Sequence, residues 1–153
     1  MDALLDKKME QSVNTIMSPC PLRVHPETSF LHVLERYAEQ GNLPLIVVNQ
    51  DGTLAGVITP MDLISALTPG DGSGGRFLIS ELDRILKSTA QNAQDLISDE
   101  SNTVPENAKI RDALQAMEHG HTSSVIIVNK QNAPVGCINL ADIIAYLIQP
   151  EAP

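Results

Sequence analysis

The sequence predicts an α/β fold made of two tandem copies of one β-α-β-β-α unit. Short motifs in the first half of the chain recur, in the same order, about 80 residues later. Within each half, short apolar runs alternate with segments whose apolar residues recur at helical spacing. This period is too long for a solenoid repeat, so we interpret the pattern as the duplication of a small domain.

The recurring motifs follow one another along the whole chain, with one-residue slips in the loops. They are Asn14–Ser18 with Gln94–Ser98, Val24–Glu27 with Thr103–Glu106, a helical stretch ending at Gly41 with one ending at Gly120, Leu45–Asn49 with Val125–Asn129, and Gly56–Asp62 with Gly136–Asp142. Neither copy alone has a large core, so we expect the two copies to pack together.

Each copy is predicted to begin with a short strand and to continue into an amphipathic helix. The helical spacing covers residues 30–38 in the first copy and residues 110–117 in the second. Gly41 and Gly120 then stand where a helix C-cap glycine is expected. The continuous apolar run that follows in each copy predicts a strand buried on both faces.

The end of each copy is predicted to be a hairpin, a second strand and a second helix. Asp51-Gly52 is a turn signal in the first copy, and residues 131–134 have the same role in the second. The second helices are expected through Leu63–Leu67 and Ile143–Leu147.

Changes in composition suggest four segments along the chain. They are an N-terminal helix in residues 1–12, a first repeat in 13–68, a linker with an amphipathic helix in 69–92, and a second repeat in 93–149. The linker opens with the glycine-rich run 69–75, and residues 77–88 have amphipathic helical spacing. The glycine run lacks the Gly-Lys-Ser/Thr ending of a phosphate-binding loop, which favours a linker.

The composition is that of a globular protein with an aliphatic core, since 42% of residues are hydrophobic and only 3% aromatic. A formal net charge of −9 without a Lys/Arg-rich run argues against nucleic acid or a membrane surface as partner. Backbone N–H groups at a helix start can still bind a small phosphate ligand. No signal peptide or bilayer-length apolar run is visible, which predicts a cytoplasmic protein with free thiols at Cys20 and Cys137.

The strongest candidate for chemistry is the strand-to-helix junction Gly56–Asp62. Thr59 stands at the N-cap, Pro60 at the first helical position and Asp62 at the third. A hydroxyl beside unpaired helix N–H groups can bind a phosphate oxygen, and a carboxylate one turn further can accept hydrogen bonds from ribose. The same residues would also stabilise the helix without a ligand, by about 1–2 kcal/mol. The spacing alone leaves both interpretations open.

The doubled pattern, in which each copy ends in Gly-apolar-Ile-Thr/Asn-x-x-Asp, closely resembles the CBS domain family over about residues 12–148. The resemblance implies a tandem pair, called a Bateman module, packed about a pseudo-twofold axis. It further implies that AMP, ADP, ATP or S-adenosylmethionine binds in clefts between the repeats, with Thr59 contacting phosphate and Asp62 contacting ribose. The base would be held near the start of each repeat, around Ile16, Met17, Ser18, Leu96, Ile97 and Ser98.

The second copy departs from the pattern at one position. Asn139 replaces the hydroxyl residue, although Asp142 is retained. Asparagine is a good N-cap and can donate a hydrogen bond to an anion, but its reach and geometry differ from those of threonine. We therefore expect the Thr59/Asp62 cleft to be the better site and the Asn139/Asp142 cleft to be weak or empty.

Together these features predict a regulatory, ligand-sensing module that requires no cofactor and is not an enzyme. The resemblance also implies a homodimer and a partner enzyme or transporter whose activity the module controls. The alternative is a ligand-free protein-interaction module, which Asn139 favours and the intact motif Thr59–Asp62 disfavours. Three further groups carry little weight: Cys20 with His25 as a catalytic pair, His119 and His121 with Glu118 as metal ligands, and Asp99, Glu100 and Glu106, which we interpret as solvated acidic surface.

Overall fold

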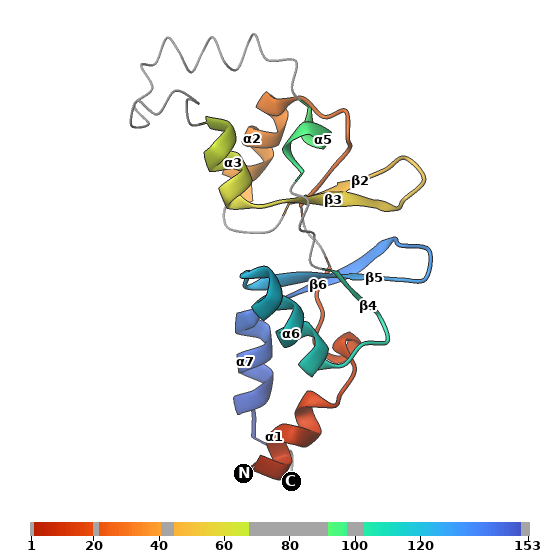
Figure 1. The fold of residues 1–153 in the computed structure, drawn as a ribbon, viewed down its shortest axis with the longest axis vertical. Helices are drawn as coiled ribbons and strands as arrows, with labels where there is room; N and C mark the ends of the chain where they lie inside the picture. The colour runs from red at the N-terminus through yellow and green to blue at the C-terminus, as the bar shows by residue number, and fades with distance from the viewer. Residues whose placement is uncertain (1, 20–21, 41–44, 68–91, 98–102, 151–153) are drawn as a thin grey trace. The chain divides into compact units, whose positions relative to one another are not determined.

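The computed structural model describes residues 2–19, 22–40, 45–67, 92–97 and 103–150. The chain divides into a central unit, residues 21–99, and a terminal unit, residues 1–20 and 100–153 (Figure 1). Each unit has its own three-stranded sheet and its own hydrophobic core. The predicted glycine-rich linker and the predicted helix over 77–88 lie outside the described residues.

The central unit has its strands in the order β1-β2-β3. Strands β1 and β2 are parallel, whereas β2 and β3 form an antiparallel hairpin. Gly52 in the hairpin turn has a φ of +90°, a conformation that glycine adopts without strain. The elements are β1 (Leu22–Val24), α2 (Phe30–Gln40), β2 (Leu45–Val48), β3 (Leu54–Ile58), α3 (Pro60–Leu67) and α5 (Ala93–Leu96).

The terminal unit repeats this topology with the strand order β4-β5-β6. Asn132 occupies the turn position that Gly52 has in the other hairpin, and its φ is +61°. Helix α1 lies at the end of α7 that points away from the sheet (Figure 1). The elements are α1 (Asp2–Met9), the 3-10 helix η1 (Val13–Thr15), β4 (Thr103–Pro105), α6 (Ile110–Gly120), β5 (Ser124–Val128), β6 (Pro134–Asn139) and α7 (Leu140–Ile148).

The predicted β-α-β-β-α order is therefore present in both copies. As predicted, the first strand of each hairpin is apolar and almost wholly buried: all four residues of β2 are buried, as are the middle three of β5. The two cores are aliphatic, with Phe30 as the one buried aromatic residue among the described residues.

The strand register corrects the alignment of the two copies. Val24 pairs with Val47, and Val104 pairs with Ile127, so Val24 corresponds to Val104 and not to Thr103. With this correction the paired positions differ by 80 in residue number, without the slip expected in this loop.

The same slip led to a wrong C-cap in the second copy. Gly120 is the last helical residue of α6, and His121 takes the left-handed conformation with a φ of +51°. The amides of His121 and Thr122 close the helix by donating to carbonyl oxygens of Glu118 and Met117. Histidine can adopt this conformation, although glycine does so at lower cost. The position 80 residues before His121 is Gly41, which lies outside the described residues.

Each core contains a segment from the start of the other repeat. Val13, from the start of the first repeat, is fully buried in the core of the terminal unit. Ala93, from the start of the second repeat, is fully buried in the core of the central unit. The Val13 amide donates to Ala108 O at 2.9 Å, and the Ala93 amide donates to Thr28 O at 2.8 Å. The leading segments of the two repeats are thus exchanged.

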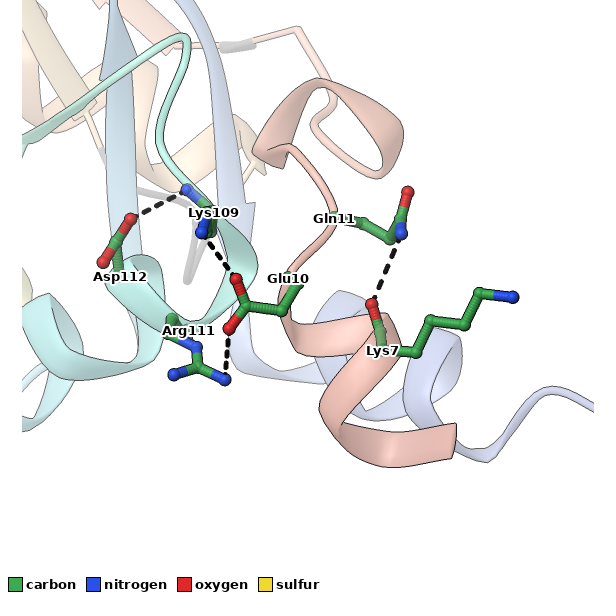
Figure 2. Close-up of polar contacts among 6 residues, drawn as sticks. All are labelled: Lys7, Glu10, Gln11, Lys109, Arg111 and Asp112. Atoms are coloured by element: carbon green, nitrogen blue, oxygen red, sulfur yellow. Dashed lines mark hydrogen bonds and ion pairs between the residues drawn. The ribbon is translucent and has the colours of Figure 1, made fainter. Parts of the chain in front are cut away.

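An ion-pair cluster fixes the chain between α1 and η1 to the start of α6. Glu10 accepts from Lys109 Nζ at 2.6 Å and also forms an ion pair with Arg111 (Figure 2). The hydrogen bond from Lys109 is the main reason that the pKa of Glu10 lies below its ordinary value, and the charge of Arg111 adds to it. None of the helices in the described part of the chain is both long and apolar enough to cross a bilayer.

Candidate ligand sites at the two strand-to-helix junctions

In the central unit, β3 runs directly into α3 at the predicted junction. The amide of Thr59 donates to Asp62 Oδ2 at 2.8 Å, and the amide of Asp62 donates to Thr59 Oγ1 at 3.2 Å. These two bonds form a capping box, in which two amides left unpaired at the helix start are satisfied reciprocally. Thr59 and Asp62 are both half-buried.

The terminal unit has the same arrangement where β6 runs into α7. The amide of Asn139 donates to Asp142 Oδ2 at 3.2 Å, and the amide of Asp142 donates to Asn139 Oδ1 at 2.9 Å. The first helical amide, that of Leu140, donates to Ser123 O at 2.8 Å. Asn139 is exposed, so this junction is more open to solvent than the one at Thr59.

Aspartate at the third helical position also caps α5 and α6, neither of which begins at one of the two junctions. At α5 the amide of Asn92 donates to Asp95 Oδ2 at 2.9 Å, and at α6 the amide of Lys109 donates to Asp112 Oδ2 at 2.9 Å. Asp62 and Asp142 therefore have a structural role that requires no ligand, as the capping interpretation predicts.

The capping box nevertheless leaves polar groups that a ligand could use. Among the described residues, no group donates a hydrogen bond to Oδ1 of Asp62, and none accepts one from the amide of Met61. Thr59 Oγ1 accepts one bond, and its hydroxyl hydrogen can still be donated. A free carboxylate oxygen, a hydroxyl donor and an unpaired helix amide thus lie within one turn of α3.

The glycine before each junction makes room for the exchanged segment. A Cβ atom added to Gly56 would lie 2.2 Å from Cγ2 of Ile97, and one added to Gly136 would lie 2.8 Å from Sδ of Met17. Ser18 forms two backbone hydrogen bonds with Cys137, at 2.9 and 2.7 Å. Packing within each unit therefore favours glycine at these positions, whether or not a ligand binds.

The structure thus assigns each predicted base-binding segment to one junction. Leu96 is buried in the core of the central unit and Ile97 packs against it, in the unit of Thr59 and Asp62. Ile16 and Met17 pack against the core of the terminal unit, in the unit of Asn139 and Asp142. Ser98 lies outside the described residues.

The sequence contains a signal for packing between these glycines and the leading segments, but none for the exchange between the copies. Gly56 and Gly136 are 80 residues apart, and so are Met17 and Ile97. A glycine and a large apolar residue that recur at the same offset can pack directly against each other in both copies. The repeat pattern did not reveal that the contact is made across the two copies.

Within the described residues, the remaining candidates do not form a site. Cys20 lies outside the described residues. His25 Nδ1 lies 3.3 Å from the backbone oxygen of Val48, at the end of β2 in the same unit. His119 and His121 are both exposed, and no group of three or more potential metal ligands occurs within the described ranges. Of the acidic stretch, Asp99 and Glu100 lie outside these ranges, whereas Glu106 is half-buried and its amide donates to Val128 O.

The family model of the CBS domain matches the chain twice, at residues 13–69 and 93–149. Two curated relatives are an uncharacterised protein of Methanocaldococcus jannaschii, 24% identical over 98% of this chain, and the arabinose 5-phosphate isomerase of Escherichia coli, 26% identical over 90%. The chain spans 32% and 38% of the lengths of these two proteins, or about a third.

Solved structures share the fold at low sequence identity. A CBS domain-containing protein of unknown function from Bacillus anthracis matches with a TM-score of 0.75 and 14% identity, over 93% of this chain and 96% of that one. CBSX2, a CBS-pair protein of Arabidopsis thaliana, was solved with AMP and matches with a TM-score of 0.67 and 21% identity, over 87% and 92%. The CBS domain of a bacterial CNNM/CorC family Mg²⁺ transporter, solved with ATP, matches with a TM-score of 0.69 and 18% identity, over 96% and 94%.

Proposed function

This chain belongs to the CBS domain family, and we propose that it is a cytoplasmic regulatory module that binds an adenosine nucleotide at the Thr59/Asp62 junction. A tandem pair of CBS domains is a regulatory module, and CBS domains are generally not catalytic. Structures with this fold include complexes with AMP and with ATP. In this proposal the nucleotide is a regulatory ligand and not a required cofactor.

The observation that carries the proposal is the set of unused polar groups at the start of α3. The Thr59 hydroxyl and the Met61 amide are donors suited to a phosphate oxygen, and Asp62 Oδ1 is an acceptor suited to a ribose hydroxyl. Ile97, half-buried beside the buried Leu96 of the exchanged segment, would supply apolar surface for the base in the same unit. In this proposal the roles of Thr59 and Asp62 are added to helix capping and do not replace it.

The Asn139/Asp142 junction is proposed as the weaker site. Asn139 Oδ1 is already engaged as the acceptor in the cap, and its exposed amide replaces the hydroxyl donor. Ile16, Met17 and Ser18 would contribute the base contacts there. ADP and S-adenosylmethionine remain candidate ligands beside AMP and ATP.

Regulation would follow from linkage between ligand and conformation. A nucleotide that binds one conformation of the module ten times more tightly than another shifts their balance by about 1.4 kcal/mol. We propose that an enzyme or a transporter in contact with the module responds to that shift. A homodimer is the proposed state of the module.

Calorimetric titration with AMP, ADP, ATP and S-adenosylmethionine tests the nucleotide proposal. The titrated proteins are the wild type, Thr59→Ala/Asp62→Ala and, as matched control, Ser29→Ala, which removes the N-terminal cap of α2 in the same unit. We expect saturable binding in the wild type and in Ser29→Ala, and its loss in the folded double variant. Equal loss in Ser29→Ala would show that a missing cap, and not a missing ligand contact, weakens binding.

A ligand-free interaction module is the second candidate, and two observations favour it. The aspartates of both junctions are accounted for by capping, as at α5 and α6. Helices α3 and α7 also expose large apolar side chains, namely Met61, Ile64, Leu140, Ile144 and Ile148. If no nucleotide produces heat or a thermal shift, the interaction module replaces the nucleotide-binding module as the proposed function. Sedimentation of variants with charged residues at Ile64 and Ile144 then tests whether the exposed apolar side chains of α3 and α7 form an interaction surface.

A further inference from the structure

Lys8 is the one polar or charged side chain that is buried within the described residues, with a relative exposure of 8%. Its Nζ donates to Tyr146 O at 3.0 Å, to Leu147 O at 3.4 Å and to Gln149 O. The same nitrogen lies 5.4 Å from the centre of the Tyr146 ring. Three carbonyl oxygens and an aromatic face thus surround one ammonium group.

The chemistry of this place suits a primary ammonium ion. The carbonyl groups at the C-terminus of a helix have no partner within the helix, and they form the negative end of the helix dipole. An ammonium group supplies three N–H donors, which matches the three oxygens of Tyr146, Leu147 and Gln149. The Tyr146 ring adds a cation–π contact.

Helix α1 contacts α7 and α6, and these contacts lie outside the hydrophobic core of the terminal unit. None of its residues belongs to the hydrophobic core, whose N-terminal members begin at Val13. Leu4, Leu5 and Met9 are only half-buried. Lys8 is therefore the buried polar contact of α1, and the ion pairs of Glu10 follow immediately after the helix (Figure 2).

We propose that the C-terminal end of α7 and the Tyr146 ring form an ammonium-binding site in which Lys8 is an internal ligand. Because Lys8 belongs to α1, occupancy of the site by Lys8 holds α1 against α7 and acts as a latch. A free primary ammonium ion can occupy the site when the Lys8 side chain is absent. Val13 is anchored in the core independently, so α1 can detach without unfolding of the unit.

Chemical rescue tests the site directly. Lys8→Ala removes the atoms that correspond to an n-propylammonium ion, so this ion is the matched probe. The matched control is Lys7→Ala, because Lys7 is exposed and its side chain points away from the cluster in Figure 2. The control ion is n-propyltrimethylammonium, which has the same charge but no N–H donors.

We expect Lys8→Ala to lower Tm by about 4–10 °C, and n-propylammonium to restore at least half of this loss in a saturable way. We expect Lys7→Ala to keep the Tm of the wild type, and n-propylammonium to raise the Tm of neither protein. The proposal is wrong if the two lysine variants behave alike, or if n-propyltrimethylammonium restores Tm as well as n-propylammonium does.

Lys8→Met keeps the aliphatic stem and tests the latch even if Lys8→Ala does not fold. We expect amide hydrogen exchange in α1 to become at least tenfold faster, while exchange in β5 stays unchanged. Unchanged exchange in α1 would mean that Lys8 does not hold the helix. Faster exchange in α1 and β5 together would mean that α1 is an integral part of the unit and not a latch.

Discussion

At the scale of single residues, four aspartates at the third helical position share a capping role, and two of them, Asp62 and Asp142, also have a proposed binding role. Asp62, Asp95, Asp112 and Asp142 each accept a hydrogen bond from the amide three residues before them. This interaction satisfies an unpaired amide and places negative charge at the positive end of the helix dipole. Capping therefore explains why aspartate is suitable at all four positions.

The capping role predicts that Asp62→Asn destabilises the ligand-free protein by about 0.5–2 kcal/mol. Asp112→Asn is the matched control, because it removes the same cap from a helix without a proposed ligand, and we expect a loss of similar size. Urea denaturation of the two variants and the wild type gives both values. If Asp62→Asn instead increased stability, the carboxylate of Asp62 would lower the stability of the folded protein, as residues at functional sites often do.

The glycines before the junctions differ in how well they would tolerate a side chain. In Gly56→Ala the new Cβ meets Cγ2 of Ile97, a branched side chain that is stiff close to the backbone. In Gly136→Ala it meets mainly Sδ of Met17, the far end of a flexible side chain, together with Ser18 O at 3.0 Å. We expect Gly56→Ala to cost about 1–3 kcal/mol and Gly136→Ala to cost less.

A double-mutant cycle checks the cause of the Gly56→Ala loss. If the clash with Ile97 is responsible, Ile97→Ala should cost less in the Gly56→Ala background than in the wild type. Additive losses would mean that backbone conformation at Gly56, and not contact with Ile97, makes alanine unfavourable.

At the scale of elements, the sequence was sufficient for the β-α-β-β-α order of each copy, but not for the short helices η1 and α5 or for the ends of the elements. The buried strands and both hairpin turns follow from apolar runs and from turn residues such as Gly52. The end of α6 was assigned one residue too early, because glycine is the strongest C-cap signal and Gly120 precedes His121. The hydrogen bonds that close α6 place its C-cap at His121, although the local preference for glycine favours Gly120.

The left-handed conformation of His121 predicts that His121→Gly stabilises the protein. Glycine adopts this conformation without a Cβ penalty, so we expect a gain of up to about 1 kcal/mol. His119→Gly is the contrasting variant, because residue 119 lies inside α6, and there glycine should cost about 1 kcal/mol. Thermal unfolding of both variants distinguishes a specific C-cap effect from a general effect of removing histidine.

The ion pairs of Glu10 predict a dependence of stability on pH. Lys109 and Arg111 hold the pKa of Glu10 below its ordinary value of 4.5 in the folded protein. A lowered pKa contributes stability above about pH 4.5, and this contribution is lost as pH falls through the folded-state pKa. We expect Glu10→Gln to be less stable than the wild type near neutral pH, and the difference to disappear under acidic conditions.

Thermal unfolding between about pH 6 and pH 3 measures this difference. Asp51→Asn is the comparison variant in the central unit. The pKa of Asp51 is also lowered, in this case by hydrogen bonds from Thr53. A difference between Glu10→Gln and the wild type that is constant across the range would show that charge on Glu10 is not its source. High salt should reduce the Glu10 effect, since the pairs are exposed.

At the scale of the whole molecule, the exchange of leading segments is the feature that the sequence did not reveal. Periodicity shows that a segment such as Asn14–Ser18 is duplicated, but both copies of a duplicated segment fit either sheet equally well by pattern. Shape decides the matter: Ile97 packs beside Gly56 and Met17 beside Gly136. The sequence therefore indicates the candidate residues one by one, whereas the structure shows which of them lie in the same unit.

The exchange predicts that the two halves of the chain remain associated after the linker between them is cut. A protease site inserted between residues 69 and 92 would leave Val13 and Met17 on one fragment and Ala93 and Leu96 on the other. Each pair packs in or against the core of a unit whose three-stranded sheet belongs to the opposite fragment. We expect the cleaved halves to elute together in size-exclusion chromatography and to separate only in denaturant.

Val13→Asp provides the control for this experiment, because it places an unpaired charge in the core of the terminal unit. In the cleaved protein this variant should weaken the association of the fragments, whereas Asn14→Asp, at the exposed neighbouring position, should not. Separation of the wild-type fragments into two folded halves without denaturant would contradict the exchange. It would mean that each repeat can bury its own leading segment, and that Met17 and Ile97 then belong to the junctions of their own repeats.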